Sequence, residues 1–237
     1  MRCGWSGALP APGIRTIRQM RSVLADPACA ASDPLYYMYR DLARSEADRR
    51  WLSAHRLRYD ITVIPPKDLS GEHVKTKGHY HPENPAGTGY PELYEVVEGT
   101  AQFLLQSRRL DDVVLVIAGT GARVIIPPGY GHISINPSPD TTLVMANLVS
   151  TAFESEYGEY ETLHGAAYYV MSDGRIIKNP HYPDMLPVRK CTAVKGLGVA
   201  GQACTGSIYS LIGDAEALAF LNEPENYPYV FMGLLKD

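Results

Sequence analysis

From about Tyr59 to Lys178 the hydrophobic pattern consists of short runs rich in β-forming residues, which is typical of β-strands. Glycine and proline separate the runs, with turn signals at Glu98-Gly99, Gly119-Thr120-Gly121 and Asp173-Gly174. The runs that predict strands are 59–64, 72–81, 92–98, 101–106, 113–117, 123–127, 132–136, 141–149, 166–171 and 175–178. Many short strands at this spacing favour an all-β sandwich or barrel.

The two ends of the chain carry a helical pattern instead. Apolar residues at helical spacing predict one helix over 14–24 and another over 214–221, and Ser45 can cap a short helix that carries Trp51 and Leu52. The two longer stripes consist of Ile14, Ile17, Met20, Val23 and Leu24, and of Ala215, Leu218, Ala219 and Leu221. We therefore expect one domain over 1–237: an N-terminal helical arm (1–58), a barrel core (59–178) and a C-terminal extension (179–237).

Composition narrows the class of protein. The formal net charge of 237 residues is −4 and the pI is about 6.0, so no global field attracts nucleic acid or an anionic membrane. No apolar run has the length of a membrane-spanning helix, and the N-terminus lacks the apolar stretch of a secretory signal. Four scattered cysteines never form a Cys-x-x-Cys pair. A reducing cytoplasm, without nucleic-acid or membrane partners, is the expected setting.

Three histidines and one glutamate form the candidate chemical site. His79 and His81 are two residues apart, so in an extended strand both imidazoles leave the same face. Glu92 lies on the next predicted strand and His132 on a later one, so a closed barrel would bring the four together. Three imidazoles and a carboxylate suit a divalent first-row metal. His55, His73, His164 and His181 have no partner at ligand spacing and are interpreted as structural.

These residues resemble the two signature motifs of the cupin superfamily, which fold as jelly-roll barrels. The first motif is Gly78-His79-Tyr80-His81, then Glu92 and Gly99; the second is Gly121, Pro127-Pro128-Gly129, His132 and Asn136. The runs Thr76-Lys77-Gly78-His79-Tyr80-His81 and Glu92-Leu93-Tyr94, the stretch RYDITVIPP and Tyr157-Gly158 resemble more closely the cupin-type glucose-6-phosphate isomerases of archaea and some bacteria. The resemblance covers about residues 33 to 180.

The resemblance implies an activity and a set of residue roles. The activity is interconversion of glucose 6-phosphate and fructose 6-phosphate, either through a cis-enediol with Glu92 as the base or by a hydride shift that needs no base. One divalent ion per subunit is implied, Fe²⁺ first, with Mn²⁺, Zn²⁺, Ni²⁺ and Co²⁺ as other candidates. A homodimer is also expected. The substrate-binding residues would be Thr62, Thr76, Gly78, Tyr157, Tyr94 and Tyr37, the first four around the phosphate.

Other interpretations stay open at this stage. An iron or manganese oxidoreductase or dioxygenase uses the same four ligands, and a non-catalytic sugar-binding cupin is a third possibility. Lys75, Lys77 and Arg123 are candidates for extra positive charge near the phosphate. Strict alternation along 72–81 would put Thr76 on the face opposite His79, so a bulge at Gly78 is needed to bring them to one pocket. Where the best-known members carry a catalytic tyrosine, this chain has Asn147-Leu148-Val149.

Overall fold

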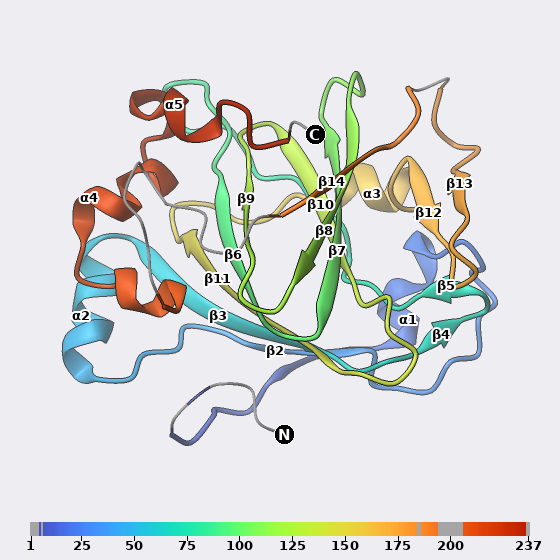
Figure 1. The fold of residues 1–237 in the computed structure, drawn as a ribbon, viewed down its shortest axis with the longest axis horizontal. Helices are drawn as coiled ribbons and strands as arrows, with labels where there is room; N and C mark the ends of the chain where they lie inside the picture. The colour runs from blue at the N-terminus through green and yellow to red at the C-terminus, as the bar shows by residue number, and fades with distance from the viewer. Residues whose placement is uncertain (1–4, 6, 184–185, 194–205, 236–237) are drawn as a thin grey trace.

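Two β-sheets face each other in the computed structural model, with short helices at both ends of the pair (Figure 1). The structure describes residue 5 and residues 7–183, 186–193 and 206–235. The larger sheet contains, in spatial order, β1 (Gly13–Arg15), β2 (Tyr36–Tyr39), β3 (Leu57–Ile64), β11 (Leu143–Ser150), β6 (Glu92–Glu98) and β9 (Arg123–Ile126). The smaller sheet contains β10 (Tyr130–Ile135), β7 (Thr100–Ser107), β8 (Val113–Gly119) and β14 (Arg189–Thr192).

Short elements complete the fold. Two-stranded ribbons are formed by β4 (Asp68–Leu69) with β5 (Glu72–His73), and by β12 (Tyr168–Val170) with β13 (Ile176–Lys178). The helices are α1 (Ile17–Met20), α2 (Glu46–Ala54), α3 (Gly158–Thr162), α4 (Ala215–Leu218) and α5 (Pro228–Phe231). Single 3₁₀ turns cover Arg21–Val23, Ile208–Leu211, Ala219–Leu221 and Pro224–Asn226. Within the described residues, no helix is long and apolar enough to cross a membrane.

The chain alternates between the two sheets from β6 to β11. β6 lies in the larger sheet, β7 and β8 in the smaller one, and then β9, β10 and β11 switch sheet at every step. Because β6 pairs with β9 and β11 while β7 pairs with β8 and β10, the strands wind as a double-stranded β-helix. This is the all-β jelly-roll barrel that the sequence predicted, and the prediction is confirmed.

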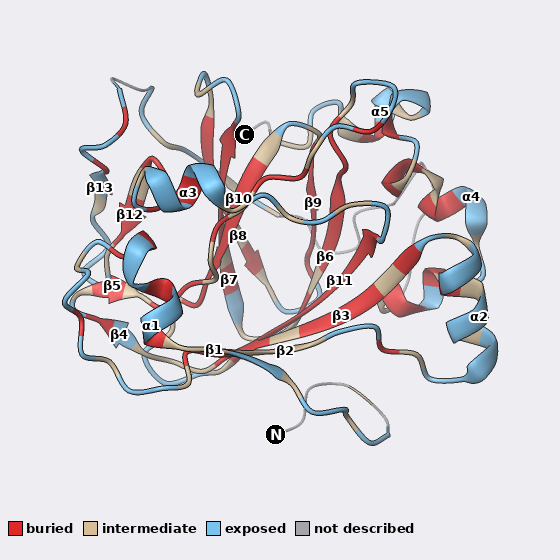
Figure 2. Ribbon diagram, turned by 180° about the vertical axis from the view of Figure 1, so that it is seen from behind, coloured by how far each residue is buried: buried red, intermediate tan, exposed pale blue. Residues whose placement is uncertain are grey.

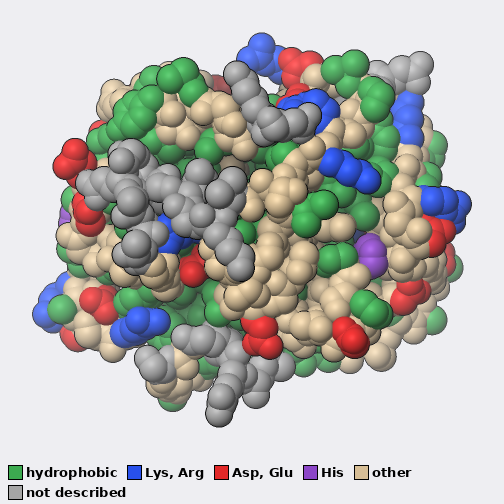
Figure 3. Space-filling view, viewed as in Figure 1, with side chains coloured by type: hydrophobic (Ala, Val, Ile, Leu, Met, Phe, Trp, Pro, Cys, Tyr) green, Lys and Arg blue, Asp and Glu red, His purple; other side chains and the backbone are tan. Residues whose placement is uncertain are grey.

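Two separate hydrophobic cores stabilise the larger sheet, one on each face. Tyr94, Phe103 and Leu105 belong to the core between the sheets, and the strands of both sheets are largely buried (Figure 2). On the outer face, Tyr59 and Ile61 of β3 pack with apolar residues of α2, α4 and the 3₁₀ turns. The opposite residues of β3 therefore face the inside of the barrel, where the candidate site lies. Charged side chains of both signs are interspersed on the face shown in Figure 3, without one large basic patch.

Most predicted strands are present, and the helix capped by Ser45 forms as expected. The hydroxyl oxygen of Ser45 accepts a hydrogen bond from the backbone N–H of Asp48, 3.0 Å away. The prediction of one continuous strand over 72–81 is wrong, because only Glu72 and His73 lie in a strand. The segment that follows bears Pro82 and Gly78 and makes isolated bridges to other segments instead.

The helical predictions at the ends need correction. Residues 14–24 divide into β1, α1 and a 3₁₀ turn, and Ile14 is exposed rather than part of a buried stripe. The arm 1–58 also supplies β2, and β14 in the extension joins the smaller sheet. The helix over 214–221 is present as α4 and a 3₁₀ turn, but Ala217 and Phe220 are buried while Ala215 is exposed.

Candidate metal centre

The segment that carries His79 and His81 is held against β10 by backbone hydrogen bonds. The N–H of Thr76 donates to the carbonyl oxygen of Ser134 at 2.8 Å, and His79 and His132 form a reciprocal bridge at 3.4 and 3.1 Å. The bridge places the His79 and His132 side chains next to each other, with ring centroids 4.5 Å apart. A ligand from an irregular segment and a ligand from a strand are thus fixed by main-chain contacts alone.

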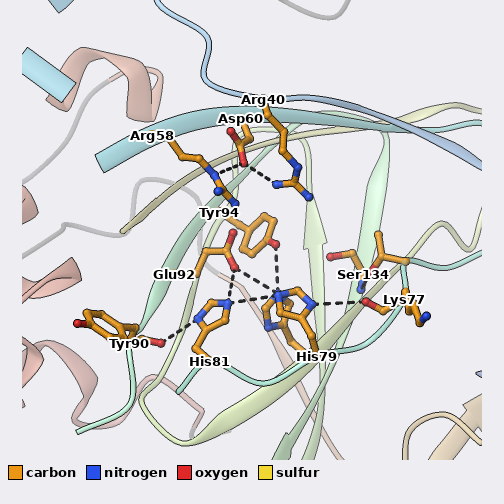
Figure 4. Close-up of polar contacts among 12 residues, drawn as sticks. Arg40, Arg58, Asp60, Lys77, His79, His81, Tyr90, Glu92, Tyr94 and Ser134 are labelled. Atoms are coloured by element: carbon orange, nitrogen blue, oxygen red, sulfur yellow. Dashed lines mark hydrogen bonds and ion pairs between the residues drawn. The ribbon is translucent and has the colours of Figure 1, made fainter. Parts of the chain in front are cut away.

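Four ligand atoms converge at one point inside the barrel (Figure 4). One ligand atom from each of His79, His81, Glu92 and His132 lies within 4.8 Å of the other three. Nε2 of His79 and Nε2 of His81 are 3.2 Å apart. Oε2 of Glu92 lies 3.4 Å from Nε2 of His81 and 3.3 Å from Nε2 of His132. Since metal–ligand bonds are about 2.0–2.2 Å, neighbouring ligand atoms around one ion are roughly 3.0–3.5 Å apart, which matches this set.

The outer nitrogens show which way the rings are protonated. Nδ1 of His81 lies 2.9 Å from the carbonyl oxygen of Tyr90, and Nδ1 of His79 lies 3.4 Å from that of Lys77. A carbonyl accepts only, so both Nδ1 atoms donate and both Nε2 atoms keep a lone pair. Two lone pairs 3.2 Å apart beside a carboxylate repel each other unless a cation lies between them. The donor set therefore fits a divalent metal ion.

Burial and the neighbouring ligands shift the pKa values of His79, His132 and Glu92. Burial, with the neighbouring His132 and His81, holds the pKa of His79 well below its usual value, and burial also lowers the pKa of His132. Burial alone would raise the pKa of Glu92, but the adjacent His132 and His81 hold it well below its usual value. Neutral imidazoles and an ionised carboxylate are the protonation states that a metal ion requires.

The cluster opens into a cavity of about 420 Å³ on the inner face of the larger sheet. Four of the sequence-predicted substrate residues line it together with the metal ligands His79, His81 and Glu92: Thr62, Thr76, Tyr94 and Tyr157. Thr76 reaches the same pocket as His79 because the segment 74–81 is not a regular strand, so strict alternation does not apply. Its hydroxyl oxygen accepts a hydrogen bond from the N–H of Ser134 at 2.9 Å.

Two predicted substrate residues are not part of the pocket wall. A Cβ added to Gly78 would lie 2.3 Å from the ring of Tyr160 on α3, so this position faces away from the pocket. Tyr37 packs against the outer core, and its neighbour Tyr36 lines the pocket instead. The Tyr36 hydroxyl accepts hydrogen bonds from the N–H of Lys77 at 3.0 Å and from Nε of Arg15 at 3.2 Å.

Tyr160 packs against both segments that carry the metal-ligand histidines, next to Gly78 and Gly131. Its ring lies against Gly78, and its hydroxyl would be 2.7 Å from a Cβ added to Gly131, the residue before His132. Tyr160 is fully buried. The two glycines therefore allow the segments that carry His79 and His132 to approach the same aromatic ring.

The positive charge of the pocket differs from the sequence expectation. Lys77 lines the pocket, but buried Lys75 pairs with Glu72, and Arg123 donates to the carbonyl oxygen of Gly206 away from the pocket.

Three arginines line the pocket wall although none of them was singled out from the sequence: Arg15, Arg40 and Arg58. The period-two spacing of Arg58, Asp60 and Thr62 on one strand was the signal that could have placed Arg58 beside Thr62.

Comparisons of the sequence with known proteins agree on one family. The sequence profile described as glucose-6-phosphate isomerase matches residues 14–186. The glucose-6-phosphate isomerase of Thermococcus onnurineus is 26% identical over 153 residues, which cover 63% of this chain and 74% of that protein. The isomerase of Thermococcus gammatolerans is 24% identical over 176 residues, 71% of this chain and 86% of that protein. Among solved structures, an oxalate oxidase superposes with a TM-score of 0.39 at 12% identity, covering 52% of this chain and 55% of its own.

Proposed function

The chain belongs to the glucose-6-phosphate isomerase family and interconverts glucose 6-phosphate and fructose 6-phosphate, and we propose that it does so at the His79, His81, Glu92 and His132 cluster. The observation that carries this proposal is the convergence of the four ligand atoms beside the cavity of about 420 Å³ on the inner face of the larger sheet. A divalent ion held there supplies Lewis-acid stabilisation of negative charge on the sugar oxygens.

Glu92 is the group that we propose to move the proton. The isomerisation removes a proton from C2 of the aldose or C1 of the ketose and returns it to the other carbon, through a cis-enediol. Oε2 of Glu92 makes both histidine contacts, so Oε1 is the atom available for the proton. The depressed pKa of Glu92 keeps the carboxylate ionised at neutral pH, as a base requires.

Tyr94 and the threonines would orient the substrate. Tyr94 is a protonated donor beside Glu92 and His132, suited to an oxygen of the reacting carbons. Thr62, Thr76 and Tyr157, with Lys77, would bind the phosphate at the other end of the pocket. In this proposal Tyr36 takes the place given to Tyr37 by the sequence, and Gly78 offers only its backbone N–H to the phosphate, since its Cα packs against Tyr160.

The remaining parts of the proposal concern metal, assembly and location. A site with three imidazoles and one carboxylate suits Fe²⁺ first, and Mn²⁺, Zn²⁺, Ni²⁺ or Co²⁺ as replacements. A homodimer in the cytoplasm is proposed from the family resemblance and from the scattered cysteines.

The decisive experiment is an isomerase assay on purified protein. The protein is loaded with Fe²⁺, Mn²⁺ or Zn²⁺, mixed with fructose 6-phosphate and monitored for glucose 6-phosphate, with and without O₂. Metal-dependent formation of glucose 6-phosphate that is independent of O₂ is expected. Oxygen consumption without isomerisation would instead favour the oxidoreductase interpretation.

A further inference from the structure

A buried carboxylate holds two arginines on the pocket wall opposite the histidines (Figure 4). Oδ2 of Asp60 accepts hydrogen bonds from Nη1 of Arg40 and from Nε of Arg58, both at 2.8 Å. Oδ1 of Asp60 accepts from the N–H of Asp41 at 2.9 Å. The Asp60 side chain is 2% exposed, whereas those of Arg40 and Arg58 are 46% and 30% exposed. The Asp60 carboxylate therefore lies behind the pocket wall, and the two guanidinium groups form the surface of that wall.

The guanidinium of Arg58 has unused donors. Only its Nε contacts Asp60, and neither Nη1 nor Nη2 has an acceptor among the residues that the structure describes. Two parallel N–H groups of this kind bind two oxygens of a phosphate or carboxylate at once. Because Asp60 fixes the guanidinium before any ligand arrives, little side-chain entropy is lost on binding.

The strand register places these arginines beside the reacting end of the sugar. Arg58 pairs with Val149, and Val149 pairs with Glu92, so Arg58 and Glu92 lie in one row, two strands or roughly 10 Å apart at Cα. Thr62 lies four residues further along the same strand, roughly 13 Å from Arg58 at Cα. The cluster is thus level with the metal ligands and distant from the threonine end of the pocket.

We propose that Arg58 and Arg40, held by Asp60, form a second anion subsite that takes a phosphate on C1 of a hexose 6-phosphate. This inference rests on the proposed function, in which C1 and C2 lie at the metal ligands and the 6-phosphate lies at Thr62 and Thr76. The ligand class is therefore a sugar bisphosphate. A ketose whose C1 oxygen is esterified cannot become an aldose by proton transfer, so such a ligand occupies the pocket as a competitive inhibitor and not as a substrate.

A pair of inert ligands that differ in one phosphate tests the subsite. The monophosphate and the bisphosphate of 2,5-anhydromannitol carry no carbonyl, so calorimetric titration of the metal-loaded protein measures binding without turnover. We expect the bisphosphate to bind about tenfold to a hundredfold more tightly, the range of a charge-assisted hydrogen bond. Equal affinities for the two ligands would overturn the proposal.

Variants of Arg58 assign the effect to its guanidinium. Arg58→Gln should bring the ratio of the two affinities close to one, and Arg58→Lys, which keeps the charge without the fork, should lower it several-fold. Arg50→Gln removes one charge from the exposed surface of α2 and should keep the wild-type ratio. Unchanged melting temperature and monophosphate affinity show that each variant is folded. A wild-type ratio in Arg58→Gln overturns the subsite.

Different experimental outcomes contradict the subsite proposal and the proposed function. A protein that prefers the bisphosphate through Arg58 but does not isomerise fructose 6-phosphate keeps the subsite and loses the function. An active isomerase in which bisphosphate and monophosphate bind equally keeps the function and loses the subsite.

Discussion

The hydroxyl of Tyr94 lies 3.2 Å from Nε2 of His132, the same nitrogen that lies 3.3 Å from Oε2 of Glu92. Burial and the charge of Glu92 raise the pKa of Tyr94 well above its usual value, so the phenol is protonated at neutral pH. Once Nε2 of His132 binds an ion, it has no lone pair for a hydrogen bond. The Tyr94 hydroxyl is then available to an oxygen of the substrate.

Tyr94→Phe should therefore impair turnover without removing the metal. Loss of one donor to a developing oxyanion is expected to lower kcat/KM for fructose 6-phosphate by about tenfold to a hundredfold. Metal content by elemental analysis should stay at the wild-type level. A fully active Tyr94→Phe protein would show that the hydroxyl does not contact the reacting oxygens.

His132→Ala should abolish tight metal binding. Loss of one of the four ligands weakens the binding of the divalent ion and leaves a gap in the wall of the site, so a chelator should extract the ion. Elemental analysis after dialysis against a chelator measures the loss. His181→Ala, an exposed histidine outside the cluster, is the matched control and should keep its metal. Full occupancy in His132→Ala would remove His132 from the ligand set.

The Glu92→Gln variant tests the role of Glu92 as a base separately from its role as a metal ligand. The amide keeps the shape and one oxygen but loses the charge, so turnover should fall by at least roughly a hundredfold, within the usual range of general-base catalysis. Proton exchange with solvent deuterium at C1 or C2 should fall with it. Glu154→Gln removes the other acidic side chain of the pocket wall and should affect turnover far less. Normal turnover by metal-loaded Glu92→Gln would favour a hydride shift.

Thr62→Val tests phosphate recognition. Thr62 lines the pocket, and its hydroxyl has no hydrogen-bond partner among the described residues, so its removal breaks no internal hydrogen bond. A lost charge-assisted bond of about 1.5–3 kcal/mol corresponds to roughly a tenfold to hundredfold loss in kcat/KM for fructose 6-phosphate. Thr62→Ser should retain activity, and turnover of unphosphorylated fructose should hardly change. Equal losses for both sugars would give Thr62 a structural role.

Metal-free protein should lose stability in mild acid. Burial holds the pKa of His79 and His132 below the usual 6.5. As the pH falls below about 6.5, the unfolded chain takes up protons that the folded chain does not, so the free energy of unfolding decreases. Below about 4.5, protonation of unfolded Glu92 adds to the decrease, since its folded pKa is also depressed. Melting temperatures of chelated protein between pH 8 and 5 should fall, and a flat profile would contradict this.

The sequence predicted the strands of the barrel well because they are short β-rich runs separated by turns that contain glycine and proline. It predicted the metal ligands because histidine and glutamate are among the few residue types that bind a divalent ion. It missed Tyr36 because the register of β2 depends on pairing with β3, and a shift of one residue exchanges the inner and outer faces. The arginines were missed because their role follows from Asp60, whose burial is a property of the folded sheet.

The contact of Tyr160 with Gly78 and Gly131 has a consequence for sequence divergence. A side chain at Gly78 would collide with the Tyr160 ring, and one at Gly131 with the Tyr160 hydroxyl and the Tyr80 ring. A smaller residue at 160 would leave a void next to both metal-bearing segments. Positions 78 and 160 are therefore expected to covary in related chains: a smaller residue at 160 should accompany a larger one at 78, whereas a larger one at 131 also requires a smaller residue at 80. A helix outside the pocket thus constrains which substitutions the metal motifs can accept.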